Sequence, residues 1–182
     1  MTIYVALLRG INVSGQKLIK MTELKRMFAD MGFGGVQTYI QSGNVIFESA
    51  EEPEPLRRRI EGGIQATFGF SVPVVVRTAD ELDRIIGDCP YPAAALPEGE
   101  SLYVALLAEA PSQAGIDRLL AYNSEIDEFR LVGREIYIIY RQSAARSKLT
   151  NVLFEQKLGV SATSRNWQTV SKLAALCAGL RP

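Results

Sequence analysis

The sequence predicts an α+β protein built from two ferredoxin-like halves, and two observations lead to that prediction. The first is an internal repeat, because the five residues Tyr4–Leu8 recur unchanged as Tyr103–Leu107, a shift of 99 positions. Further along, Gly43 matches Gly133 at a shift of 90 positions, so the first half carries nine additional residues between Leu8 and Gly43. The second observation is that strand-like and helix-like segments follow the same order in both halves.

The first half is predicted to form a strand, a helix, a hairpin, a helix, a strand and a short helix. These segments are Ile3–Leu8, Thr22–Met31, Val36–Ile40 with Val45–Phe47, Glu54–Phe68, Val72–Arg77 and a helix that ends near Gly87. Apolar residues spaced three or four positions apart indicate the two longer helices, and the polar stretch Gln41–Asn44 is typical of a hairpin turn. Thr78 followed by Glu81 is a capping-box pattern, which predicts the start of the short helix.

The second half repeats this order with shorter connections. Its segments are Leu102–Leu107, Gln113–Tyr122, Phe129–Val132 with Glu135–Tyr140, Lys148–Leu158, a weak strand near Val160–Thr163, and a last helix Asn166–Cys177. Each half therefore reads β-α-β-β-α-(β)-α, which predicts helices packed on one face of an antiparallel sheet. The predicted domains are residues 1–88 and 100–182, joined by a proline-rich linker at 89–99.

Composition excludes several classes of protein. The 182 residues are 47% hydrophobic and 22% charged, which is ordinary for a globular domain. No stretch approaches the ~20 apolar residues of a membrane span, and the apolar run Ile3–Leu8 lacks the preceding basic segment of a signal peptide. The absence of histidine excludes Ser-His-Asp and Cys-His catalysis, and Cys89 and Cys177 lack metal-site spacing. We therefore expect a cytoplasmic protein without membrane association, metal or cofactor.

The long connection at residues 9–20 is the first candidate site. The second half crosses the same gap with the short link Ala108–Ser112, so the fold does not require the longer loop. The loop carries three basic residues and no acidic one, and Gly10 and Gly15 allow backbone amides to approach a ligand closely. It also leads into a predicted helix N-terminus, which favours an anion.

A structural interpretation of the same loop stays open. Its four apolar residues Ile11, Val13, Leu18 and Ile19 could simply plug the loop onto the sheet. The spacing from Gly10 to Gly15 resembles a phosphate-binding loop, but Gln16 stands where that motif requires lysine. A nucleoside triphosphatase is therefore not predicted.

The distribution of charge is the second clue. The totals balance at 20 basic and 20 acidic residues, yet residues 141–182 contain seven basic residues and a single acid, Glu155. Ser147–Lys148 and Ser164–Arg165 are each expected at a helix start, with the serine as N-cap. A cation there is unfavourable unless an anion is nearby, so the pattern indicates a bound anion. The alternative is a solvated basic surface neutralised by the acidic segments.

Three stretches carry a family resemblance: Leu8–Val13, Thr38–Phe47, and a tail made of Ser147–Asn151 with Thr163–Leu173. They resemble the bacterial proteins grouped as domain-of-unknown-function family 1697. The resemblance implies a duplicated ferredoxin-like fold and implies no activity. Ser14 departs from the pattern, where a second glycine is expected. The signature positions are Arg9, Gly10, Asn12, Gly15, Gln41, Ser42, Gly43, Asn44, Ser147, Lys148, Arg165 and Asn166.

The preferred functional hypothesis is a binding module for an anionic ligand, either a phosphate-bearing small molecule or single-stranded nucleic acid. The expected phosphate contacts are Arg9, Lys17, Lys148 and Arg165. The expected orienting and backbone positions are Gly10, Asn12, Gly15, Gln41, Asn44 and Asn166. One alternative is an enzyme whose base is a lysine or a carboxylate; another is a structural protein that binds partners through its strand edges. The sequence leaves the oligomeric state open.

Overall fold

The computed structural model describes residues 1–182. The chain divides into two compact units, which we call unit 1 (residues 1–83 with 172–182) and unit 2 (residues 84–171). The helices α3 (Ala79–Gly87) and α6 (Trp167–Ala178) each contribute residues to both units. The domain boundaries drawn from the sequence, 1–88 and 100–182, stay a prediction.

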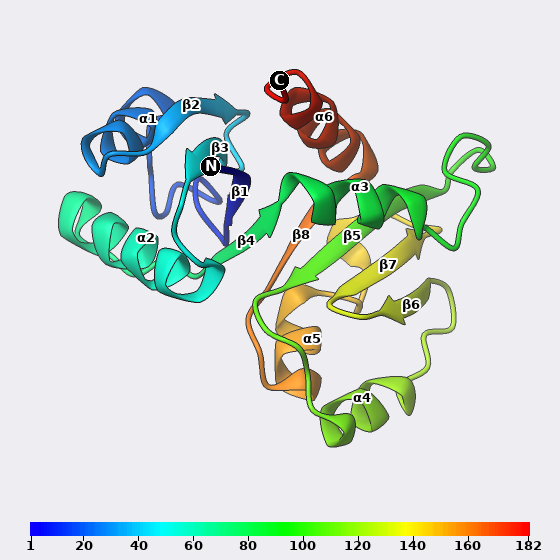
Figure 1. The fold of residues 1–182 in the computed structure, drawn as a ribbon. Helices are drawn as coiled ribbons and strands as arrows, with labels where there is room; N and C mark the ends of the chain where they lie inside the picture. The colour runs from blue at the N-terminus through cyan, green and yellow to red at the C-terminus, as the bar shows by residue number, and fades with distance from the viewer. The chain divides into compact units, whose positions relative to one another are not determined.

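Unit 1 contains a four-stranded antiparallel sheet in the order β2-β3-β1-β4 (Figure 1). Its strands are β1 (Thr2–Leu8), β2 (Gly34–Tyr39), β3 (Asn44–Ser49) and β4 (Val74–Thr78). The helices α1 (Met21–Asp30) and α2 (Pro53–Phe68) pack on one face of this sheet. This is the ferredoxin-like order that the sequence predicts.

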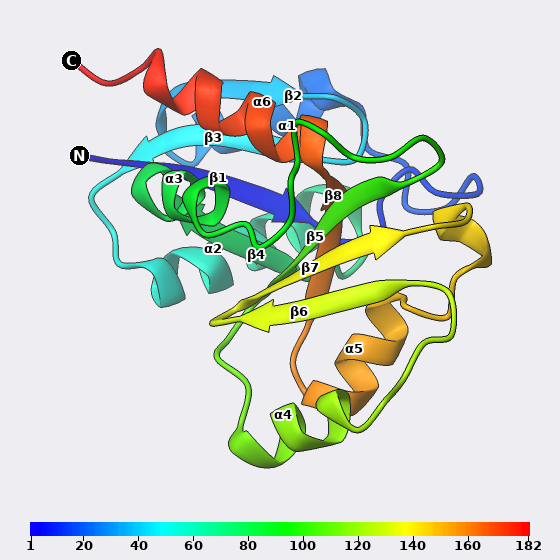
Figure 2. The same cartoon turned by 90° about the vertical axis from the view of Figure 1, so that its right-hand side faces the viewer.

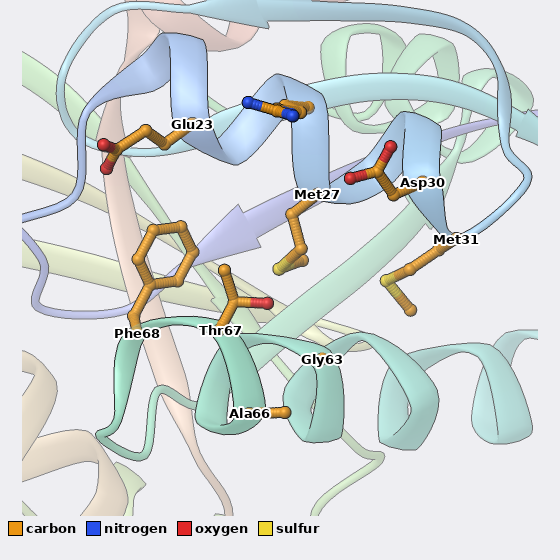
Figure 3. A pocket seen from close by; sticks show the side chains of 9 residues that line it. Glu23, Met27, Asp30, Met31, Gly63, Ala66, Thr67 and Phe68 are labelled. Carbon is orange, nitrogen blue, oxygen red and sulfur yellow. The ribbon is translucent and has the colours of Figure 1, made fainter.

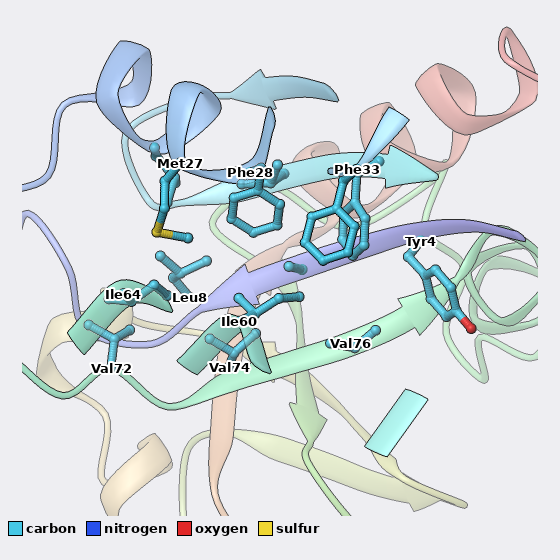
Figure 4. Close-up of a cluster of buried hydrophobic side chains, with 14 of the residues drawn as sticks. Tyr4, Leu8, Met27, Phe28, Phe33, Ile60, Ile64, Val72, Val74 and Val76 are labelled. Carbon is cyan, nitrogen blue, oxygen red and sulfur yellow. The ribbon is translucent and has the colours of Figure 1, made fainter. Parts of the chain in front are cut away.

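The core of unit 1 lies between that sheet face and the two helices (Figure 4). Phe47 is fully buried and is the centre of an aromatic group: its ring centroid lies 5.7 Å from that of Tyr4, 5.3 Å from Phe28 and 4.8 Å from Phe33. Burying a side chain of this size contributes about 1.5–3 kcal/mol. The aromatic group therefore joins α1 to β1 and β3.

Unit 2 repeats the same sheet in the order β6-β7-β5-β8 (Figure 2). Its elements are β5 (Ser101–Leu107), α4 (Gln113–Leu120), β6 (Glu128–Val132), β7 (Glu135–Tyr140), the 3₁₀ turn η1 (Ala144–Arg146), α5 (Asn151–Leu158) and β8 (Ala162–Asn166). The helices α4 and α5 supply Leu119, Phe154 and Leu158 to a core on one sheet face. The predicted duplication is confirmed.

The structure corrects the two helix starts that the sequence places at cationic residues. The helix α5 begins at Asn151, and Thr150 is its cap, accepting a hydrogen bond from the Leu153 amide. Ser164 and Arg165 lie in β8 and not at a helix start, since the strand continues to Asn166. Neither serine therefore caps the start of a helix, and neither Lys148 nor Arg165 lies in the first turn of a helix, where the dipole would favour an anion.

The predicted capping box is confirmed at the start of α3. The Thr78 amide donates to Glu81 Oε2 at 2.8 Å, and the Glu81 amide donates to Thr78 Oγ1 at 3.1 Å.

No helix in the structure has the length and apolar character needed to cross a membrane.

Candidate functional site

The side chain of Asn12 makes three of the hydrogen bonds that hold the loop at residues 9–20 in place. Asn12 Nδ2 donates to the Ile19 carbonyl at 3.0 Å and to the Gln41 carbonyl at 2.8 Å, while Asn12 Oδ1 accepts from the Ile19 amide at 2.8 Å. These bonds close the loop on itself and tie it to the turn between β2 and β3. In this structure the Asn12 side chain therefore has a structural task.

The conformation of the turn between β2 and β3 is also held by specific contacts, those of Gly43 and Asn44. Gly43 has φ 88°, and a Cβ added there would lie 2.6 Å from Ile11 Cδ1. Asn44 is fully buried, and its Nδ2 donates to the Tyr39 carbonyl at 2.9 Å and to Ser42 Oγ at 3.0 Å. Only glycine meets both demands at position 43, the positive φ and the close approach of the loop.

Backbone strain is concentrated in these two segments. The non-glycine residues with positive φ in the whole chain are Asn12, Ser14, Lys17 and Ile40. Lys17 Nζ donates to the Ser71 carbonyl at 2.7 Å, which fixes the far side of the loop. Such conformations are costly and cluster at functional sites in proteins.

The structural interpretation of the loop, in which apolar residues plug it onto the sheet, holds for Ile11 and Ile19, which are each 2% exposed. It does not hold for Val13 and Leu18, which are exposed.

A hollow of about 530 Å³ lies beside this loop. Its lining residues are Asn12, Leu18, Ile19, Lys20, Met21, Thr22, Glu23 and Gln41. Lys20 is the one cation among them and Glu23 the one carboxylate, so charge does not select an anion here. Of the predicted site residues, this hollow brings together Asn12 and Gln41.

A second hollow, of about 250 Å³, lies in unit 2, and we call it the Lys148 hollow. Its lining residues are Tyr122, Asn123, Ser124, Glu125, Ile126, Gln142, Arg146 and Lys148. Arg146 and Lys148 are exposed and form no ion pair in the structure, while Glu125 is the one acid in the lining. The hollow therefore has a cationic and polar wall.

The wall of the Lys148 hollow is organised by a carboxylate, Asp127, that is 5% exposed. Asp127 accepts hydrogen bonds from Ser147 Oγ at 2.6 Å, Gln142 Nε2 at 2.7 Å and the Arg141 amide at 2.8 Å. Burial opposes the charged form, but the hydrogen bonds outweigh it and hold the pKa of the Asp127 carboxyl below its usual value. Asp127 thus anchors both sides of the segment that carries Arg146 and Lys148.

The remaining predicted residues of unit 2 serve other contacts. Arg165 is 7% exposed in β8, and its Nη1 donates to Thr163 Oγ1 and to the Ser164 carbonyl, both at 2.9 Å. Burial lowers the pKa of its guanidinium to about 10. Asn166 Oδ1 accepts from the Thr169 amide at 2.8 Å at the start of α6. Neither residue lines the Lys148 hollow.

Sequence reasoning missed the Asp127 cluster and a second buried arginine. Arg77 is fully buried on β4 opposite Val5, and Arg165 on β8 is opposite the equivalent Val104. A comparison of the two halves extended to β4 and β8 would have found this pair. No sequence signal marks Asp127, because its partners lie 14 to 20 positions away.

Comparisons with known proteins agree with the fold. A solved structure, the conserved bacterial protein SP0830 from Streptococcus pneumoniae, is similar with a TM-score of 0.77 and 19% identity, over 97% of this chain and 98% of that one. The match to an unknown protein from Galdieria sulphuraria covers 91% of this chain and 98% of that one at 10% identity, with a TM-score of 0.27. No curated protein matches. The family model described as a protein of unknown function, DUF1697, matches residues 1–137, and the chain therefore belongs to the DUF1697 family.

Proposed function

We propose that the protein binds a small phosphate-bearing molecule in the Lys148 hollow of unit 2. The observation behind this proposal is the pair of cations, Arg146 and Lys148, that border the hollow without forming an ion pair. Two other cations of the same basic tail are neutralised. Arg141 pairs with Glu100 at 2.9 Å, and Arg181 pairs with Asp83 at 2.7 Å and with Asp80 at 2.8 Å.

The neutral groups around the two cations suit the same ligand. Asn123, Ser124 and Gln142 place amide and hydroxyl groups on the wall, and Asp127 already orients the Gln142 amide. A phosphate offers acceptor oxygens, and hydrogen bonds to a charged partner are about twice as strong as neutral ones. Orienting these groups before binding lowers the entropic cost of forming the complex.

The size of the hollow favours a small molecule over a polymer. Its volume of about 250 Å³ lies just below the usual range of ligand pockets, about 300–1,000 Å³. The Tyr122 ring forms one wall, with Lys157 Nζ 6.0 Å from its centroid, and offers a flat apolar surface for a ring or a sugar. The experiment described below distinguishes a small phosphate-bearing ligand from single-stranded nucleic acid.

The geometry favours binding over catalysis in this hollow. The serine nearest to a carboxylate is Ser147, and its hydroxyl donates to Asp127 and also accepts from the Leu149 amide at 3.0 Å. Ser147 is 6% exposed, so its oxygen is engaged and enclosed, and not presented to a substrate.

The test is isothermal titration calorimetry with inorganic phosphate, adenosine monophosphate and a single-stranded oligonucleotide. Replacing both Arg146 and Lys148 by alanine should weaken binding of the monophosphate tenfold or more, because each lost charged contact is worth about 1.5–3 kcal/mol. Lys25→Ala, which removes an exposed cation from α1, is the matched control and should change nothing.

Three outcomes would contradict the proposal. These are the absence of heat with all three probes, unchanged affinity in the double variant, and equal losses in the Lys25→Ala control. Tight binding of the oligonucleotide alone, with affinity that falls steeply with salt, would replace the small ligand by single-stranded nucleic acid.

A further inference from the structure

A third hollow lies in unit 1 between α1 and α2, and we call it the α1–α2 hollow (Figure 3). Its volume is about 520 Å³, within the usual range of small-molecule pockets. Its lining residues are Glu23, Arg26, Met27, Asp30, Met31, Gly63, Ala66, Thr67 and Phe68. It shares no lining residue with the Lys148 hollow and does not depend on the proposed function.

Unit 2 shows that the fold does not require this hollow. In unit 2 the equivalent helices meet closely, because a Cβ added at Gly115 of α4 would lie 3.1 Å from the Leu158 carbonyl oxygen of α5. In unit 1 a Cβ added at Gly63 of α2 would instead meet the end of a flexible side chain, Met31 Sδ at 2.9 Å. Met27 of α1 and Met31, the residue that directly follows α1, thus lie where unit 2 brings helix backbones together.

The inner wall of the α1–α2 hollow is apolar and deformable. Figure 3 shows Met27 of α1 and Met31, just after α1, extending toward the turns of α2 that carry Gly63 and Ala66, with Phe68 at one end. Methionine side chains are unbranched and polarizable, and they adapt to aromatic and aliphatic groups. The interior is therefore suited to the ring or chain of a small molecule.

The rim of the hollow is negative. Glu23 and Asp30 lie one on each side along α1, and neither forms an ion pair in the structure. The last turn of α2, which includes Thr67 and Phe68, contains no basic residue, so the partial negative charge of its carbonyl end is not offset. Arg26 is the one cation in the lining, against two carboxylates and a helix C-terminus.

We infer that the α1–α2 hollow binds a small organic cation, an aromatic or alkyl ammonium. Its apolar body lies against Met27, Met31 and the turns of α2 that line the hollow, and its ammonium group lies at the negative rim, next to one of the two carboxylates. The Phe68 ring adds aromatic surface at one end of the hollow. The apolar interior sets the shape of the ligand, and the rim sets the sign of its charge.

Methionine methyl NMR tests this inference directly. The chain has four methionines; in protein labelled with ¹³C at the methyl groups, titration with 2-phenylethylammonium should shift the Met27 and Met31 signals and leave exposed Met1 unchanged. The anion 3-phenylpropanoate, of similar shape, should bind at least tenfold more weakly. Equal or tighter binding of the anion, or unchanged Met27 and Met31 signals, would overturn the inference.

Two adjacent glycines of α2 provide matched variants. Gly63→Leu fills the hollow, whereas a side chain at Gly62 meets nothing within 4 Å. Binding should be lost in Gly63→Leu and kept in Gly62→Leu, although both changes improve helix propensity equally. A surface variant that does not disturb the core, Glu23→Gln with Asp30→Asn, should abolish the preference for the cation. A Gly63→Leu protein that still binds, or a charge-neutral rim that keeps the preference, would contradict the inference.

Discussion

Unit 1 and unit 2 have the same strand order and differ in how the first strand reaches the first helix. In unit 2 the chain crosses directly, and Ser112 caps α4 by accepting a hydrogen bond from the Gly115 amide at 3.1 Å. In unit 1 the strained loop at residues 9–20 intervenes, and α1 begins without a side-chain cap. The sheet and its helix layer therefore tolerate either connection, so the loops are free to carry function.

The polar residues are also organised differently in the two units. In unit 1 the Asn12 amide joins a loop to a turn through backbone carbonyls. In unit 2 the Asp127 carboxylate gathers two side chains and an amide beneath a cationic hollow. The first arrangement satisfies backbone groups; the second orders the segment that carries Arg146 and Lys148.

The largest expected effect comes from removing one aromatic core residue from each unit. Phe47→Ala should destabilise unit 1, and Phe154→Ala should destabilise unit 2, by about 3–5 kcal/mol each. Both residues are fully buried. Chemical denaturation followed by NMR of both units measures the effect. Loss of signals from both units in each variant would show that the units unfold together; loss from one alone would show that they are independent.

The second prediction compares the two equivalent turn glycines. Gly43→Val should cost about 2–3 kcal/mol, because strain at positive φ adds to the 2.6 Å approach of Ile11 Cδ1. At Gly133, φ is 61° and a Cβ would meet only Glu135 Oε2 at 3.8 Å, so Gly133→Val should cost less. Urea denaturation of both variants gives the two values. An equal loss of unfolding free energy in the two variants would mean that the close approach of Ile11 adds nothing to the cost at Gly43.

The third prediction concerns the hydrogen bonds of Asn12, which tie the long loop of unit 1 to the turn between β2 and β3. Asn12→Ala leaves the Ile19 amide and two carbonyls without their partner, and it should destabilise unit 1 by about 1–3 kcal/mol. Hydrogen exchange of the Ile19 amide should become faster. Asn123→Ala, in a comparable exposed loop of unit 2, is the control. An Asn12→Ala protein with native stability and slow exchange would show that backbone bonds alone hold the loop.

The smallest expected effect depends on pH and belongs to unit 2. The pKa of Asp127 is depressed in the folded protein, so its contribution is fully present above the ordinary carboxyl pKa of ~3.9 and is lost as pH falls further. Asp127→Asn should cost about 1–2 kcal/mol at neutral pH. The difference from the natural protein should shrink in acid. Thermal melting from pH 7 to pH 3 measures it, and a constant difference would rule out this role for the charge.

The duplication, the element order and most element types could be predicted from the amino-acid sequence. The repeated strand Tyr4–Leu8, the apolar spacing of α2 and the Thr78–Glu81 capping box each depend on residues close along the chain. Local patterns of this kind report directly on local backbone conformation. The weak strand near Val160 was displaced toward Asn166 because its pairing with β5, rather than its own composition, defines it.

The roles of the polar residues could not be predicted, because they depend on contacts between distant parts of the chain. Ser147 reads as a helix cap in the sequence, yet its hydroxyl bonds to Asp127, 20 positions earlier. Asn12 reads as a ligand contact, yet it bonds to the Gln41 carbonyl, 29 positions later. The physical reason is that a buried polar group must find a hydrogen-bond partner, and the fold decides which partners come within reach.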